Sequence, residues 1–171
     1  MIGYEFNDGG RKDAGYKDFT GDCVVRAISI ATGLDYTELF KKLGKLTNER
    51  RGFATKEYTQ NYMTGIALAD YEPVLEELGY TKSTSKAGYA IPTYTQAYEA
   101  FGDCLVLNTN GTHLAAIVDG KLVDTFDHRL YDWNGASRES LTTIIYHKWN
   151  GNWKTGQETE IARVGNSTSD E

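Results

Sequence analysis

The chain has 171 residues and a formal net charge of −6, with a pI of about 5.1. This length suffices for one domain with a hydrophobic core. The acidic balance argues against nucleic acid or an anionic membrane as the main partner. We find no signal-peptide pattern and no apolar run as long as a membrane span, and two cysteines do not make a disulfide framework. We therefore expect a protein of the reducing cytoplasm with free thiols.

The first predicted helix begins at a cysteine. Residues 3–22 show no clear period, and we expect an ordered arm or loop that leads to Cys23. The helix is predicted to run from Cys23 to about Thr32, with Gly33 as its C-terminal cap. Asp22 precedes the helix, where its carboxylate is expected to accept hydrogen bonds from the unpaired N–H groups of the first turn.

Three further helices are indicated by apolar residues at helical spacing and by capping residues. Polar and small residues predict loops over residues 47–69 and 81–91. The helices are expected from Asp35 to about Leu46, from Asp70 to Gly79, and from Thr93 or Thr95 to about Phe101.

The second half of the chain has the composition of strands. The dipeptide Asp119-Gly120 predicts a two-residue type I′ hairpin turn. A turn is expected at 109–111 and a polar loop over 127–140. Because helices come first and antiparallel strands after, the predicted fold class is α+β. The strands are expected at 104–108, 112–118, 121–126 and 141–149.

Cys23 is the first candidate for chemistry. At the first helical position it meets the positive end of the helix dipole, which favours the thiolate, and the thiolate is the nucleophilic form of cysteine. The residues that follow it are apolar on nearly every side, which predicts a buried helix. The alternative interpretation is a small buried hydrophobe that happens to be a cysteine.

A histidine and an aspartate are predicted to meet on the strand hairpin. The two-residue turn sets Val118 opposite Lys121, and this register puts His113 and Asp124 on one face as diagonal neighbours. A carboxylate there orients an imidazole by accepting a hydrogen bond from one of its nitrogens. A lone strand histidine is usually structural, but a buried aspartate needs a donor. Asp127 is the competing acid.

A zinc site is the alternative use of these side chains. Four residues of types that bind zinc could in principle form such a site: Cys23, Cys104, His113 and Asp124. The chain lacks the paired Cys or His spacings of zinc motifs. We therefore expect no metal and no cofactor.

The order Cys23, His113, Asp124, with helices before strands, resembles the papain-like cysteine peptidase superfamily. The segment G-D-C-V-V-R-A-I at 21–28 is similar to the cysteine block of the ovarian-tumour deubiquitinases, D-G-[DN]-C-x-x-R-[AS], with Thr20 in place of the first Asp. The segment G-T-H-L-A-A-I-V at 111–118, followed by Val123-Asp124, resembles peptidases that cleave double-glycine leaders and small papain-like proteins of bacteriophages.

This resemblance implies a single papain-like domain over 1–150, with the Cys helix packed on a C-terminal antiparallel sheet. A polar, partly disordered extension would follow over 151–171. The implied catalytic residues are Cys23, His113 and Asp124, with Asp127 as a supporting acid.

The same resemblance implies an oxyanion site and a cleft wall. Such enzymes usually carry a Gln before the Cys, and residues 16–20 have none. The backbone N–H of Cys23 would supply one oxyanion donor and the side chain of Lys17 or Thr20 another. Trp133 would wall the substrate cleft.

The implied function is a cysteine hydrolase, a peptidase or isopeptidase, that acts on a protein or peptide without cofactor, nucleic acid or membrane. The same triad also serves transglutaminases, deamidases and acyltransferases. The alternative is a weak or inactive papain-like scaffold that binds or assembles with another protein. Its location would be the cytoplasm, or a viral particle or the cytoplasm of an infected host.

Overall fold

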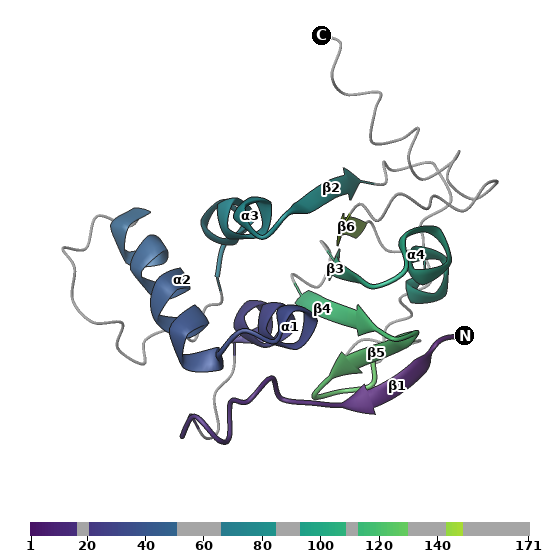
Figure 1. Cartoon of the computed structure of the whole chain (residues 1–171), viewed down its shortest axis with the longest axis horizontal. Coiled ribbons are helices and arrows are strands. Elements are labelled where there is room, and N and C mark those ends of the chain that lie inside the picture. Colours follow the sequence, from purple (N-terminus) through teal and green to yellow (C-terminus); the bar gives the residue numbers. More distant parts are fainter. Residues whose placement is uncertain (17–20, 51–65, 85–92, 109–112, 130–142, 149–171) are drawn as a thin grey trace, which may run out of the picture.

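The computed structural model describes residues 1–16, 21–50, 66–84, 93–108, 113–129 and 143–148. In this part of the chain, four helices and a six-stranded sheet form a mixed α+β fold (Figure 1). None of the described helices is long and apolar enough to cross a membrane.

The sheet has the strand order β1-β5-β4-β3-β6-β2. Strand β1 runs parallel to β5, and the other neighbouring pairs are antiparallel. The sheet therefore has β1 at one edge and β2 at the other, with β4 and β3 at its centre. The strands are β1 (Gly3–Phe6), β2 (Tyr80–Thr84), β3 (Cys104–Asn108), β4 (His113–Val118), β5 (Lys121–Asp124) and β6 (Thr143–Lys148).

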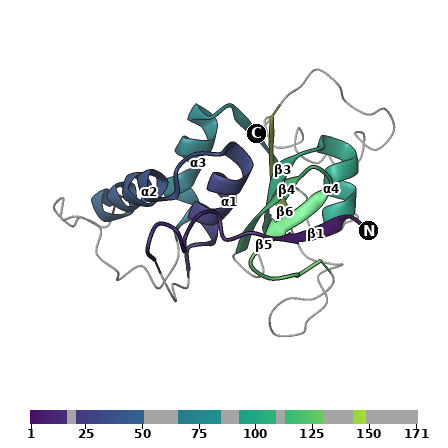
Figure 2. The same cartoon turned by 60° about the horizontal axis from the view of Figure 1, so that its bottom comes forward.

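Helices cover both faces of the sheet. Helices α1 (Cys23–Thr32), α2 (Tyr36–Arg50) and α3 (Leu68–Glu77) lie on one side, and α4 (Tyr94–Phe101) lies on the other (Figure 2). Alternate residues of a strand face opposite sides, so β4 contributes Leu114 and Ala116 to the core under α1, and Ala115 and Ile117 to the core under α4.

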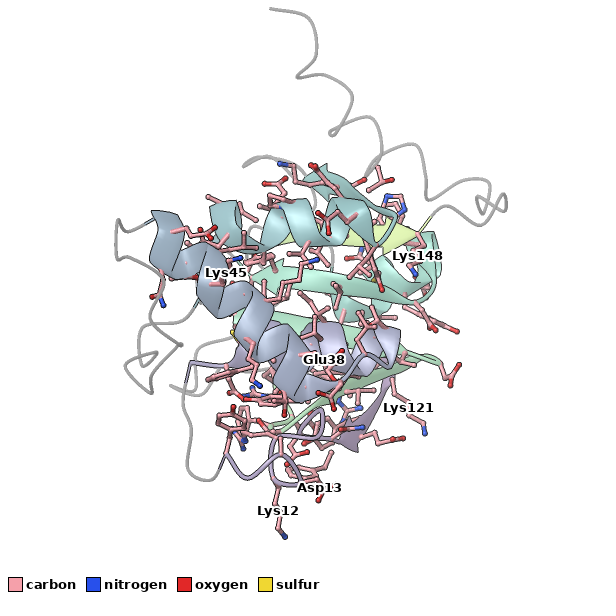
Figure 3. The ribbon with its side chains drawn as sticks, turned by 60° about the vertical axis from the view of Figure 1, so that its left-hand side comes forward. Lys12, Asp13, Glu38, Lys45, Lys121 and Lys148 are labelled. Atoms are coloured by element: carbon pink, nitrogen blue, oxygen red, sulfur yellow. The ribbon has the colours of Figure 1, made fainter. Side chains whose placement is uncertain are left out.

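Helix α2 is amphipathic and closes the first core. Glu38 and Lys45 lie on its outer face (Figure 3), and Lys45 pairs there with Glu49. Its opposite stripe is buried and consists of Tyr36, Leu39, Phe40 and Leu43. This spacing explains how a helix with many charged residues stays packed on α1.

Several local predictions are confirmed. Helix α1 has the predicted bounds, and Gly33 ends it in the left-handed region with φ 73°. Thr93 caps α4 in a reciprocal arrangement with Gln96. Asp119 and Gly120 both have positive φ, 50° and 71°, as a type I′ turn requires.

Other local predictions are wrong, mostly at the two edges of the sheet and at the ends of helices and strands. Residues 3–6 form strand β1 and residues 80–84 form β2, where we expected an arm or loop. Helix α2 extends beyond Leu46 to Arg50, and α3 begins at Leu68. Strand β5 ends at Asp124, short of 126. Neither edge strand has a run of apolar residues to mark it, since β1 reads G-Y-E-F and β2 reads Y-T-K-S-T, and short, charged edges are usual in natural sheets.

Asp70 does not begin a helix. It lies inside α3, buried, and its carboxylate accepts a hydrogen bond from the Thr47 hydroxyl at 3.0 Å. This bond joins the end of α2 to the start of α3. A capping residue and a buried acceptor look alike in a sequence, because both are polar residues beside an apolar run.

Some predictions fall outside the described residues. These are the roles of Lys17, Thr20 and Trp133, the turn at 109–111, residues 130–140 of the polar loop, and the extension 151–171. The domain bounds stay predictions for the same reason.

Candidate active site

Cys23 is the first residue of α1, as its sequence context predicted. The helix packs against β4, and this contact sets the cysteine beside the start of that strand. There the sulfur hydrogen-bonds with the His113 ring and with the backbone N–H of Leu114. The other thiol, Cys104, is buried in the core under α4.

The pKa values of the two thiols are shifted in opposite directions. Burial raises the pKa of Cys23, but the hydrogen bond and charge of His113, the Leu114 N–H and the charge of Arg26 outweigh it, and the pKa is lowered. Burial and the Asp103 charge raise the pKa of Cys104 well above that of an ordinary thiol. Cys23 is therefore the activated thiol of the pair.

His113 stands between the thiol and a carboxylate. Its Nε2 lies 2.6 Å from Asp124 Oδ2, which leaves Nδ1 for the sulfur of Cys23. Burial lowers the pKa of His113, but the hydrogen bonds with Asp124 and Cys23 outweigh it and raise the pKa to about 9. The ring is therefore an imidazolium at neutral pH, and its positive charge favours the thiolate form of Cys23 beside it.

Asp124 is 3% exposed, and both of its carboxylate oxygens accept hydrogen bonds from protein donors. Burial raises its pKa, but the hydrogen bonds from His113 and His128 and the charge of Arg26 dominate and hold the pKa far below its usual range. The carboxylate is thus ionised. Oδ1 accepts from the Arg26 guanidinium at 3.2 Å, the Thr125 N–H at 2.7 Å and the Thr125 hydroxyl at 3.4 Å, and Oδ2 accepts from His113 and His128.

Arg26 links the two ends of the site. It is 7% exposed on α1, one turn after the cysteine, and its guanidinium bonds both Asp22 and Asp124. Asp22 therefore does not cap the helix with its side chain, contrary to our prediction. Its carboxylate is taken up by Arg26 and by the Tyr36 hydroxyl at 2.9 Å. Asp22 thus pairs with two charged donors, Arg26 and Arg11, which bind a carboxylate more strongly than the neutral N–H groups of the first turn.

His128 is the residue that sequence reasoning missed. It follows β5, is 2% exposed, and lies between Asp124 Oδ2 at 2.9 Å and the Tyr94 hydroxyl at 2.8 Å. Only a weak signal for it is present in the sequence, since it lies four residues after Asp124 in a segment without a helix or strand pattern. Tyr94 had no signal, since it comes from α4 on the far side of the sheet.

Asp127, the competing acid, lies at the surface. Its carboxylate pairs with the Arg129 guanidinium at 2.8 Å, and this hydrogen bond lowers the pKa of Asp127. The structure thus brings together Cys23, His113 and Asp124, and gives Asp127 a different partner.

His113, Asp124 and His128 are also the side chains that come closest to a metal site among the described residues, with ligand atoms within 4.8 Å of one another. Both imidazole Nε2 atoms already point hydrogen-bonding protons at the carboxylate. Zinc needs ligand distances near 2.0–2.2 Å and unprotonated nitrogens. The Arg26 charge beside Asp124 further disfavours a cation, so a hydrogen-bonded network fits these residues better than a metal.

No protein-family model, curated protein or solved structure matches this chain. Fold and site define it as a mixed α+β protein in which Cys23, at the start of helix α1, lies beside His113 and Asp124 of the sheet.

Proposed function

We propose that the chain is a papain-like cysteine hydrolase, a peptidase or isopeptidase, with Cys23 as nucleophile. The observation that carries the proposal is the hydrogen-bonded series from Cys23 through His113 to an ionised, buried Asp124. Nucleophilic catalysis by cysteine needs these three parts: a thiolate, a base beside it and a group that orients the base.

The reaction begins from the thiolate–imidazolium pair. The Cys23 sulfur attacks the carbonyl carbon of a peptide or isopeptide bond, and the C–N bond then breaks as His113 gives its proton to the leaving amine. The product is a thioester on Cys23. His113, now neutral, takes a proton from water as the water oxygen attacks the thioester, and the acid product and the thiolate are released.

Asp124 supports both steps from behind the histidine. Because His113 Nε2 stays bonded to the carboxylate, Nδ1 is the nitrogen that moves the proton. The negative charge of Asp124 stabilises the imidazolium without taking the proton itself, since its pKa lies far below that of His113.

The Leu114 N–H and the N-terminus of α1 add positive potential around the sulfur. The same groups suit a negative charge that develops on the carbonyl oxygen beside it. A transferase, with an amine or alcohol in place of water, would use the same array. The alternative from a different functional class is a scaffold that binds another protein without catalysing a reaction.

The test is acylation of the protein with p-nitrophenyl acetate. The rate is measured from the release of p-nitrophenolate, and peptide mass spectrometry identifies the acetylated residue. We expect one acetyl group on Cys23 in wild type, followed by turnover as the thioester hydrolyses. His113→Ala should lose at least about a hundredfold in acylation rate, because the base contributes roughly two to four orders of magnitude. Cys104→Ala is the matched control and should acylate like wild type.

Two results would count against the proposal. Equal acetylation of Cys23 and Cys104 in the folded protein would show that Cys23 is not activated. Stoichiometric acetylation of Cys23 without turnover would favour the scaffold, because such a protein keeps the thiolate but not the machinery that hydrolyses the thioester.

A further inference from the structure

Asp124 serves two imidazoles with a single oxygen. His113 and His128 both reach Oδ2, at 2.6 and 2.9 Å, and the Tyr94 hydroxyl holds the far nitrogen of His128 at 2.8 Å. We propose that His128, fixed by Tyr94, is a positioning residue that holds the Asp124 carboxylate against His113. This role rests on the proposed function, since it acts on the same Cys23–His113 pair.

The hydrogen bonds assign the protons of His128. An ionised carboxylate only accepts, so Nε2 of His128 carries the proton that faces Asp124. In the neutral ring Nδ1 then accepts from the Tyr94 hydroxyl. The ring is packed edge-on against both Tyr94 and His113, at 5.3 and 4.8 Å between centroids. One tautomer and one orientation are therefore favoured.

Arg26 competes with the two imidazoles for the Asp124 carboxylate, and this competition explains why a second histidine matters. Arg26 draws on Oδ1 from the other side, at 3.2 Å, and a guanidinium prefers to bind a carboxylate with both oxygens. A carboxylate that turned toward Arg26 would leave His113 without its partner. Two N–H donors on Oδ2 oppose that rotation more strongly than His113 does alone.

Among the described residues, two other titratable groups near His128, Asp127 and Tyr4, have partners of their own. Asp127 precedes it directly and is bonded to Arg129 through both carboxylate oxygens. The Tyr4 hydroxyl bonds the main-chain carbonyl of Asp124 at 3.2 Å. The cation that competes with the imidazoles for the carboxylate is thus Arg26.

The experiment is an NMR titration of the histidine rings in the full chain, which has three histidines and therefore a simple spectrum. In wild type we expect His113 to titrate near its raised pKa of about 9. His128→Leu removes one donor from Oδ2, and we expect the pKa of His113 to fall by about one unit or more, which makes the ratio of imidazolium to imidazole tenfold smaller at a given pH. His128→Gln restores an N–H near the position of Nε2 and should recover at least half of the shift.

The control is His147→Leu. His147 is also buried, on β6, where it bonds Ser83, so the substitution damages the fold without touching Asp124. An unchanged or raised pKa of His113 in His128→Leu would overturn the positioning role. So would an equal fall in His147→Leu, or a His128→Gln variant no better than His128→Leu.

Wild type alone gives a second test if His128→Leu does not fold. Nitrogen shifts of the ring must show a proton on Nε2 of His128, and a ring protonated on Nδ1 alone would overturn the inference. A wild-type His113 that titrates near the ordinary value of 6.5 would instead contradict the proposed function itself. Failure of the two proposals is therefore distinguishable.

Discussion

Replacement of Arg26 by methionine tests the charge network that links the helix to the hairpin. Arg26 is 7% exposed and holds two carboxylates, Asp22 at 1% and Asp124 at 3% exposed. Methionine keeps the volume of the side chain but leaves both buried charges without this partner. Removal of one partner of a buried ion pair costs about 3–5 kcal/mol, roughly a third or more of the stability of an ordinary domain.

The assay is urea unfolding at neutral pH, with the free energy of unfolding compared at equal slope. Lys45→Met is the matched control, since Lys45 is 68% exposed and pairs with Glu49 at the surface of α2 (Figure 3). We expect less than about 1 kcal/mol for that exposed pair. The difference between wild type and Arg26→Met should shrink as pH falls, because protonation of Asp124 removes the buried charge that Arg26 no longer stabilises. A loss in Arg26→Met no larger than in Lys45→Met would refute the reasoning.

Three further outcomes are expected. Asp124→Asn should lower the pKa of His113 by about one to three units in an NMR titration, while Asp127→Asn should leave it unchanged; equal shifts would mean that the wrong acid was chosen. Because the folded-state pKa of Asp124 is depressed, its contribution to stability is present above the ordinary value of 3.8 and is lost as pH falls below it, so wild type should lose more stability than Asp124→Asn in acid unfolding curves. Gly120→Ala should cost about 1–2 kcal/mol in urea unfolding, since Gly120 has φ 71° and its Cβ would meet the Tyr98 ring at 3.3 Å; wild-type stability would show that the turn relaxes freely.

The sequence was most informative where local chemistry decides the structure. The start of α1 at Cys23, its end at Gly33 and the type I′ turn at Asp119-Gly120 depend on a few neighbouring residues, and all were predicted. The hairpin then fixed the register, and the hydrogen bond between His113 and Asp124 follows from it.

The rest of the site depends on contacts between segments far apart in the chain. Tyr94 on α4 reaches His128, and Arg26 on α1 reaches Asp124, 98 positions away. Neither contact leaves a periodic pattern in the sequence. Asp22 illustrates the limit, because its local context predicts a cap and its tertiary context makes it the partner of a buried arginine.

The central claim is that His113 holds Cys23 as a thiolate. The direct measurement is the rate of alkylation of Cys23 by iodoacetamide against pH, in a Cys104→Ala background with and without His113→Ala. With His113 present we expect the rate to be half-maximal clearly below the ordinary thiol value of about 8.5. Without His113 the midpoint should rise to that value or above it, because the hydrogen bond and charge of His113 are lost while burial, the largest single contribution, still raises the pKa of the thiol. The same midpoint in both proteins, at or above the ordinary value, would contradict the account.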